Sequence, residues 1–211
     1  INLNAKEKEK QEASVKRILD TARVCYLCGG YSITFHAGYY LKDSKSAVYN
    51  RIKSHLKHIV ETLRNEDIEI WVRPETTGKP TQFGNLDELI SLSQEIDMVM
   101  PVIDFAHLHA RSNGKWNSYE EFCDILTRLE KGLGRDALNN MHIHVAGIAY
   151  SEKGEKHHLN LEESDLKHRE LMHALKDFRC RGVVISESPN IEEDAKLMKH
   201  VYTSLGDRNE G

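Results

Sequence analysis

Long apolar runs are absent from this 211-residue sequence. A membrane-spanning helix needs about 18 or more consecutive apolar residues, and no stretch reaches that length. Residues 1–8 also lack the apolar core of an export signal. The chain has no initiator Met, which predicts that it begins partway through a longer protein. We therefore expect no membrane partner and a cytoplasmic location.

Cysteine is scarce as well, with four residues, and only Cys25 and Cys28 form a CxxC pair. A single CxxC can serve as a redox pair or as half of a zinc site. However, no second CxxC follows, and the pair lies near the end of an amphipathic helical segment. We interpret these residues as reduced, buried structural thiols, which suits a cytosolic protein.

Positive charge is not in excess. The chain has 29 Lys and Arg residues against 33 Asp and Glu residues, so its formal charge is −4. A protein that binds nucleic acid usually carries a basic patch that contacts the phosphates. The acidic balance therefore counts against nucleic acid as a partner, unless bound cations supply the positive field.

Glycine-rich phosphate-binding fingerprints are missing after every strand-like segment. The sequence has instead a regular alternation of helical and strand-like segments. Apolar residues at helical spacing predict six helices, and short β-prone runs predict five strands between them. The predicted helices span residues 13–28, 48–63, 85–96, 118–129, 166–178 and 190–205, and the predicted strands span 31–36, 68–73, 98–103, 141–145 and 182–185.

Three of these helices begin with a polar residue followed three positions later by Glu. This spacing is typical of a capping box, in which each side chain bonds the backbone of the other residue. The pairs are Asn85 with Glu88, Ser118 with Glu121, and Asn190 with Glu193. We expect each pair to fix the first turn of its helix.

Strands that alternate with helices indicate a parallel sheet built from βαβ units. A complete (β/α)8 TIM barrel usually needs about 250 residues, and only five strands are readable here. We therefore predict one α/β domain over residues 1–211, a (β/α)8 TIM barrel that lacks its N-terminal strands in this chain. An open doubly wound sheet is the alternative.

Each predicted strand delivers a His, Asp or Glu at its C-terminal end. The residues are His36, Glu75, Asp104 with His107, His142 with His144, and Glu187. Barrel enzymes place their chemistry at this end of the strands. A carboxylate there is partly desolvated, which costs free energy unless it is paired or binds a metal. A single such residue is more often a cap or a loop residue, but the whole set predicts a site for zinc, manganese or iron.

The set is larger than one ion needs. His142 and His144 share a face of their strand because side chains alternate, so one can bind metal while the other supports it. Residues 153–158, predicted as a loop, add His157 and His158. Such a set suffices for two or three ions, as is typical of phosphoester hydrolysis. Other histidines lie on helical faces and are predicted to be surface residues: His55, His58, His168, His173 and His200.

Five stretches carry a resemblance to a known family. They are residues 34–38 (Thr-Phe-His-Ala-Gly), 74–78 (Pro-Glu-Thr-Thr-Gly) followed by Asn85 and Leu86, 102–107 (Val-Ile-Asp-Phe-Ala-His), 141–144 (Met-His-Ile-His) with 154–158 (Gly-Glu-Lys-His-His), and 185–189 (Ile-Ser-Glu-Ser-Pro). In order and spacing they resemble the endonuclease IV family of apurinic/apyrimidinic endonucleases, within the xylose-isomerase-like barrels. Each stretch is weak alone, and their combination is specific.

Carried over by position, this resemblance implies that His36 and Glu75 hold a first zinc, and that Glu75 bridges to a second. The ligands of the second zinc would be Glu75, Asp104, Glu187 and a strand histidine, with His144 preferred to His142. Glu75 and Glu187 are the residues that the resemblance makes catalytic.

The third zinc would use His107 and a pair of residues from the predicted loop. Where the family has Asp-Arg-His, this chain has Glu155, Lys156 and His157, and His158 is a competing ligand. The Asp-to-Glu difference is a departure from the family pattern.

The function that the resemblance implies is hydrolysis of DNA on the 5′ side of an abasic site, by a monomer with two or three Zn²⁺ ions or with Mn²⁺. The alternative is a single-metal sugar isomerase or epimerase of the same superfamily, which moves a proton at a carbon next to a carbonyl. His107 and the loop pair distinguish them, because one metal does not need these ligands, while the acidic charge favours the sugar. A non-catalytic fragment or binding module is the third possibility.

Overall fold

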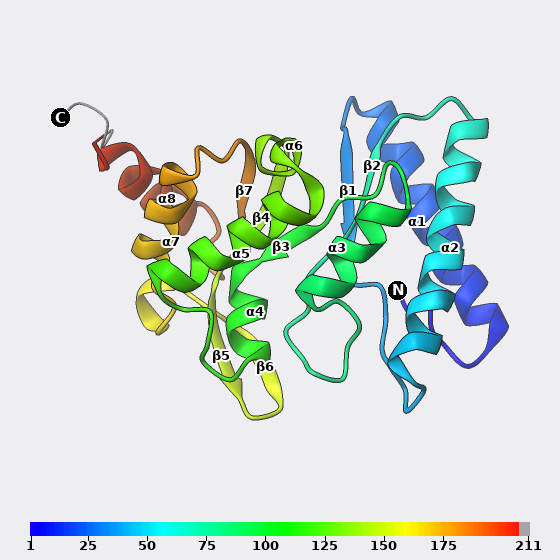
Figure 1. Cartoon of the computed structure of the whole chain (residues 1–211), viewed down its shortest axis with the longest axis horizontal. Helices are drawn as coiled ribbons and strands as arrows, with labels where there is room; N and C mark the ends of the chain where they lie inside the picture. Colours follow the sequence, from blue (N-terminus) through cyan, green and yellow to red (C-terminus); the bar gives the residue numbers. More distant parts are fainter. Residues whose placement is uncertain (207–211) are drawn as a thin grey trace. The chain divides into compact units, whose positions relative to one another are not determined.

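The computed structural model describes residues 1–206, in which helices and strands alternate along the chain (Figure 1). The chain divides into two compact units, Ile1–Val102 and Ile103–Gly211. All five predicted strands are present, so the α/β class predicted from the sequence is confirmed. Among the described residues, no helix is long and apolar enough to span a membrane.

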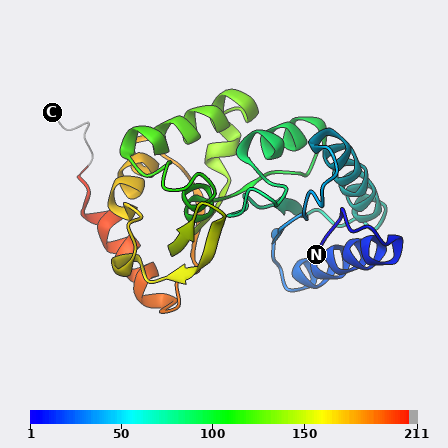
Figure 2. The same cartoon turned by 90° about the horizontal axis from the view of Figure 1, so that it is seen from below.

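The first unit contains two parallel strands and three helices. These are α1 (Lys8–Leu27), β1 (Ser32–Phe35), α2 (Lys45–Asn65), β2 (Trp71–Pro74) and α3 (Leu86–Glu95). The strands pair from Ser32 opposite Trp71 to Phe35 opposite Pro74. Helices α1 and α2 lie side by side (Figure 2). The predicted apolar stripe of α2 faces inward and joins the strands and α1 in one hydrophobic core.

Helix α3 starts as the sequence predicts. The Asn85 side chain accepts from the Glu88 backbone N–H at 3.0 Å, and the Glu88 carboxylate accepts from the Asn85 N–H at 3.0 Å. This reciprocal capping box satisfies two backbone donors that a helix end leaves open. The capping box fixes the start of α3, which follows the segment after β2 in which Glu75 lies.

The second unit contains a three-stranded sheet, a hairpin and the remaining helices. In the sheet, β4 (Met141–Val145) lies between β3 (Val102–Asp104) and β7 (Gly182–Ser186), and the hairpin joins β5 (Gly147–Ser151) to β6 (Gly154–Leu159) in antiparallel pairing. The helices are α4 (Phe105–Arg111), α5 (Tyr119–Leu133), α6 (Arg135–Asn139), the 3₁₀ turn η1 (Leu161–Glu163), α7 (His168–Asp177) and α8 (Glu192–Ser204).

Strands β4 and β7 run parallel, from Met141 opposite Gly182 to Val145 opposite Ser186. Gly182 has a positive φ of 128°, and a Cβ added there would lie 2.0 Å from the Met141 carbonyl oxygen. Only glycine allows so close an approach. This residue therefore sets the register that brings the ends of β4 and β7 together.

Two strands begin later than predicted. The segment 68–73 becomes regular strand only at Trp71, and the segment 98–103 only at Val102. Met98 has a positive φ of 62°, which interrupts an extended backbone, and Pro101 cannot donate to a strand ladder. The apolar run was therefore a correct sign of a strand but a poor guide to its first residue.

Two further predictions about local structure are wrong. Residues 154–158, predicted as part of a loop, lie in β6. Asn190 does not cap the last helix, because Ile191 occupies the N-cap position without a side-chain bond. The Asn190 side-chain amide instead donates to Asp194 Oδ1 at 2.9 Å.

Burial also differs from prediction at two residues. His168, predicted to be a surface residue, is buried on α7, and that burial lowers the pKa of its imidazole. Cys28, predicted to be buried, is exposed at the end of α1, whereas Cys25 is partly buried. All four thiols are free, so the CxxC pair is not a disulfide.

Candidate metal centre

In the first unit, His36 and Glu75 come together at the C-terminal ends of β1 and β2. The parallel register brings Phe35 opposite Pro74, so the next residue of each strand lies at the same edge. The Glu75 N–H donates to the Phe35 carbonyl at 3.1 Å. His36 Nε2 lies 3.5 Å from Glu75 Oε1, and Thr34 donates its hydroxyl to Glu75 Oε2 at 3.4 Å. The Glu75 carboxylate is thus buried beside an imidazole.

In the second unit, Asp104 ends β3 and begins α4. Its Oδ1 accepts from the His107 backbone N–H at 2.7 Å, so Asp104 is the N-cap of the helix. Its Oδ2 lies 3.3 Å from His107 Nδ1. The residue is fully buried. One carboxylate therefore starts the helix and orients the first histidine that the helix carries.

His144 and Glu187 meet at the ends of β4 and β7. The Glu187 N–H donates to the Val145 carbonyl at 3.0 Å, which extends the parallel pairing by one residue. His144 Nδ1 lies 3.3 Å from Glu187 Oε1. His144 is buried, whereas the Glu187 side chain keeps 32% of its exposure. Donor atoms of Asp104, His144 and Glu187 all lie within 4.8 Å of one another; we call these three residues the strand-end group.

A second set of donors lies where the hairpin meets α4. His107, Glu155 and His158 each offer one ligand atom, and these atoms lie within 4.8 Å of one another; we call these residues the hairpin group. His107 Nε2 is 3.7 Å from Glu155 Oε2. The rings of His107 and His158 have centroids 5.7 Å apart.

Hydrogen bonds fix which nitrogen of each hairpin-group histidine is available. His158 Nδ1 lies 2.9 Å from the Glu187 carbonyl oxygen. A carbonyl only accepts, so Nδ1 carries the proton and Nε2 keeps its lone pair. His107 Nδ1 likewise faces the Asp104 carboxylate, leaving Nε2 toward Glu155. An imidazole that donates through one nitrogen to a carboxylate or carbonyl is typical of a metal ligand.

Two sequence-predicted candidates lie outside these groups. His142 shares a strand face with His144, at a ring-centroid distance of 5.1 Å, but only His144 is in the strand-end group. His157 is exposed on β6, whereas the next residue, His158, turns inward. Adjacent residues of a strand point to opposite faces, so the hairpin brings only one of this pair to His107.

The donor types fit a divalent transition metal. The strand-end group combines two carboxylates and one imidazole, and the hairpin group combines two imidazoles and one carboxylate. Mixed nitrogen and oxygen ligands suit zinc, manganese or iron. A fully buried carboxylate such as Asp104 is costly unless charge or hydrogen bonds compensate it. Either group could therefore hold a cation through its own side chains.

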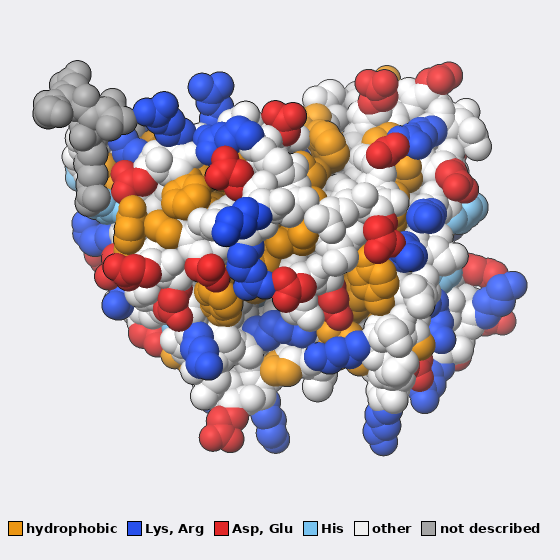
Figure 3. All heavy atoms as spheres, in the orientation of Figure 1, with side chains coloured by type: hydrophobic (Ala, Val, Ile, Leu, Met, Phe, Trp, Pro, Cys, Tyr) orange, Lys and Arg blue, Asp and Glu red, His pale blue; other side chains and the backbone are white. Residues whose placement is uncertain are grey.

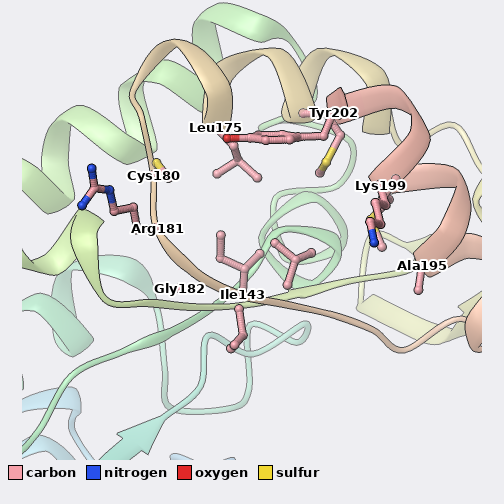
Figure 4. A pocket seen from close by; sticks show the side chains of 12 residues that line it. Ile143, Leu175, Cys180, Arg181, Gly182, Ala195, Lys199 and Tyr202 are labelled. Carbon is pink, nitrogen blue, oxygen red and sulfur yellow. The ribbon is translucent and has the colours of Figure 1, made fainter. Parts of the chain in front are cut away.

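The second unit also has an apolar cavity of about 450 Å³ between β7, α7 and α8 (Figure 4). Leu175 and Tyr202 from the helices face Ile143 of the sheet across it. Burial there raises the pKa of the Cys180 thiol to about 12. No sequence-predicted site residue is among the described residues that line it. The cavity is thus separate from both donor groups.

The model of the xylose isomerase-like TIM barrel family matches residues 1–203. The chain belongs to this family. Its α/β fold is therefore the predicted TIM-barrel fold. An uncharacterized protein of Methanocaldococcus jannaschii is 48% identical over 205 residues, which cover 97% of this chain and 74% of that protein. That relative supports the family without adding an activity.

Several solved structures resemble this chain in fold. A D-tagatose 3-epimerase-like protein has a TM-score of 0.73 at 20% identity, with 96% of this chain and 72% of that chain covered. The IolI protein, crystallised with a zinc atom, has a TM-score of 0.70 at 13% identity, with 98% and 75% covered. A D-psicose 3-epimerase with D-fructose has a TM-score of 0.59 at 18% identity, with 88% and 59% covered.

These comparisons confirm the broader part of the resemblance inferred from the sequence. They support the xylose-isomerase-like superfamily, whereas membership of the endonuclease IV family in particular is not supported. Two of the three structures named are sugar epimerases or similar to one, and none is an endonuclease. The motifs at the strand ends are thus evidence for the superfamily and do not select among its chemistries.

Proposed function

We propose that this protein is a divalent-metal-dependent isomerase or epimerase of a small sugar. The observation that carries the proposal is the strand-end group, which places two carboxylates and an imidazole at the strand ends of a xylose isomerase-like barrel. Sugar epimerases among the structural neighbours support this reaction class. The acidic net charge of −4 also suits an uncharged substrate better than a polyanion.

The three side chains of the group differ in what they can do. Asp104 is fully buried, and its carboxylate accepts a hydrogen bond from the helix backbone, so it offers a metal ion an oxygen ligand in a fixed position. His144 is buried beside Glu187. A divalent cation, when bound, polarises the sugar carbonyl and acidifies the adjacent C–H. Glu187 is the most exposed of the three, so it can reach a substrate carbon and accept that proton.

Epimerisation returns the proton from the other face of the planar intermediate, so it needs a second acid. The resemblance implied that Glu75 is a catalytic metal ligand and not this acid, and its carboxylate is buried beside His36. Its part in the reaction stays a prediction. If Glu75→Gln retains full sugar turnover, Glu75 has no part in the mechanism.

The proposal predicts metal-dependent proton exchange on a ketose. We expect the protein, stripped with chelator and reloaded with Mn²⁺, Zn²⁺ or Co²⁺, to exchange a carbon-bound proton next to the carbonyl with D₂O. NMR of a panel of ketohexoses and ketopentoses measures this exchange, and chromatography identifies the epimer formed. No exchange with any sugar and any of these metals would reject the proposal.

A second candidate function is a metal-dependent phosphodiesterase acting on abasic DNA. The observation in its favour is the hairpin group, whose two imidazoles present Nε2 atoms beside a carboxylate. A one-metal isomerase does not need these additional donors. Against it, Lys and Arg side chains alternate with Asp and Glu on the face drawn in Figure 3, with no continuous basic area there. Cleavage of a duplex with one abasic site, tested in parallel with the sugars, separates the two candidates.

A further inference from the structure

A cluster of three side chains lies behind the hairpin group in the second unit. His109 is fully buried on α4, and its Nε2 lies 3.0 Å from Asp165 Oδ1. Tyr150 of β5 donates its hydroxyl to Asp165 Oδ2 at 2.6 Å. The Tyr150 and His109 rings meet edge-on, with centroids 4.8 Å apart. We call these three residues the clamp, since they join a helix, a hairpin strand and the segment before α7.

Two members of the clamp make further hydrogen bonds to their surroundings. His109 Nδ1 donates to the Lys115 carbonyl at 2.9 Å. The Asn117 side chain donates to the Asp165 carbonyl at 2.9 Å and accepts from the Lys167 N–H at 2.7 Å. The Asn117 side chain therefore fixes the backbone from Asp165 to Lys167.

The Tyr150 hydroxyl lies close to the backbone at Gly114. A Cβ added at Gly114 would lie 2.9 Å from the Tyr150 hydroxyl oxygen, and Gly114 has a positive φ of 95°. The hydrogen bond to Asp165 raises the pKa of Tyr150 to about 12, so the hydroxyl stays a donor. Burial raises the pKa of Asp165, but bonds from Tyr150 and His109 outweigh it and leave that pKa below its ordinary value.

The clamp is linked to the hairpin group through two elements. On α4, His109 follows His107 by two residues, so the two side chains leave the helix in different directions. In the hairpin, Tyr150 pairs across the strands with Glu155, next to a register shift between Ala149 and Tyr150. The same helix and the same cross-strand pair thus carry both the clamp and the hairpin group. Figure 1 shows these elements, α4, β5 and β6, next to one another.

We propose that Tyr150, Asp165 and His109 are positioning residues that lock the hairpin onto α4 and so hold Glu155 and His158 at ligand distance from His107. Without the lock, the 3.7 Å separation of His107 Nε2 and Glu155 Oε2 depends on the remaining packing of a partly buried two-stranded hairpin. An isolated hairpin is only marginally stable. The clamp adds three contacts to the hairpin: the partly buried His109–Asp165 bond, the exposed Tyr150–Asp165 bond, and the edge-on packing of Tyr150 on the buried His109 ring.

The test compares Tyr150→Phe with Tyr119→Phe. The first variant removes the bond to Asp165 and keeps the ring against His109. The second removes a matched bond, because Tyr119 donates to Asp177 at 2.7 Å away from the hairpin. Zn²⁺ and Co²⁺ are titrated into chelator-stripped protein, followed by calorimetry, by visible Co²⁺ absorption, and by NMR of the His107 and His158 imidazoles. Thermal unfolding reports stability.

We expect Tyr150→Phe to weaken the cation binding that shifts the His158 resonance by up to about 10-fold, the lower end of the effect of losing a direct partner of a ligand, because Tyr150 acts through the hairpin and touches no ligand by hydrogen bond. Tyr119→Phe should bind as wild type, with a similar melting temperature. Asp165→Asn serves as a second variant and should also weaken binding. Unchanged affinity in both clamp variants would overturn the proposal, as would a wild-type protein in which no cation shifts the two resonances. Because the readout is cation binding, it is independent of sugar turnover.

Discussion

Glu187→Gln is expected to lower sugar turnover by about 100- to 10,000-fold, the range that loss of a general acid–base group costs. The amide cannot accept the proton from carbon, although it has nearly the same shape. The backbone bonds of this residue, to Val145 and to His158, do not involve its side chain. We therefore expect the variant to fold, and deuterium exchange on the best ketose substrate measures the loss.

The matched control for this variant is Glu192→Gln. Glu192 is exposed in the first turn of α8 and belongs to neither donor group. Its activity should equal that of the wild type. Full exchange by metal-loaded Glu187→Gln would show that the proton moves through another group, and the proposed role of Glu187 would then be abandoned.

Asp104→Asn and Asp104→Ala should both lose metal affinity, but only the second should lose stability. Asn removes the charge and keeps a side-chain oxygen for the His107 N–H, whereas Ala removes both. Losing an N-cap costs about 1 kcal/mol, which lowers the melting temperature of a chain of this size by about 2–4 °C. The loss of affinity should exceed the roughly 10- to 100-fold effect of an outer-sphere partner.

Calorimetric titration with Zn²⁺ and thermal unfolding of the stripped proteins separate the two effects. Ser118→Ala is the control, since Ser118 caps α5 in the same way without belonging to a donor group. It should lose stability and keep metal affinity. Wild-type affinity in Asp104→Asn would contradict the assignment of Asp104 as a ligand.

The ends of the strands could be predicted because parallel pairing is regular. A run such as residues 182–185 shows where a strand lies, and the residues that follow it must reach the same edge as those of its neighbour. The pairing of β4 with β7 brings His144 and Glu187 together at this edge. The sequence alone could not decide whether His142 or His144 is the metal ligand, since both side chains lie on the same face of the strand. The register of β4 and β7 favours His144, because it lies opposite Ile185 and is therefore closer to Glu187 than His142, which lies opposite Val183.

The hairpin could not be predicted from its own residues. Its turn and second strand are rich in charged and histidine side chains, which are more common in loops. These residues form a strand because β5 supplies a partner, which is a tertiary effect that a local pattern does not contain. Gly154, with a positive φ of 91°, was the available sign of a tight turn. The clamp residues His109, Tyr150 and Asp165 had no sequence signal, because they meet only after the hairpin has packed.

Metal content per chain tests the central claim most directly. We predict that protein purified without chelator holds at least one zinc, manganese or iron ion per chain by elemental analysis, and that chelation removes it together with proton exchange on the sugar. Reloading with the same metal should restore both. A folded protein that neither retains nor takes up such an ion, or one whose exchange activity survives complete metal removal, would contradict the account.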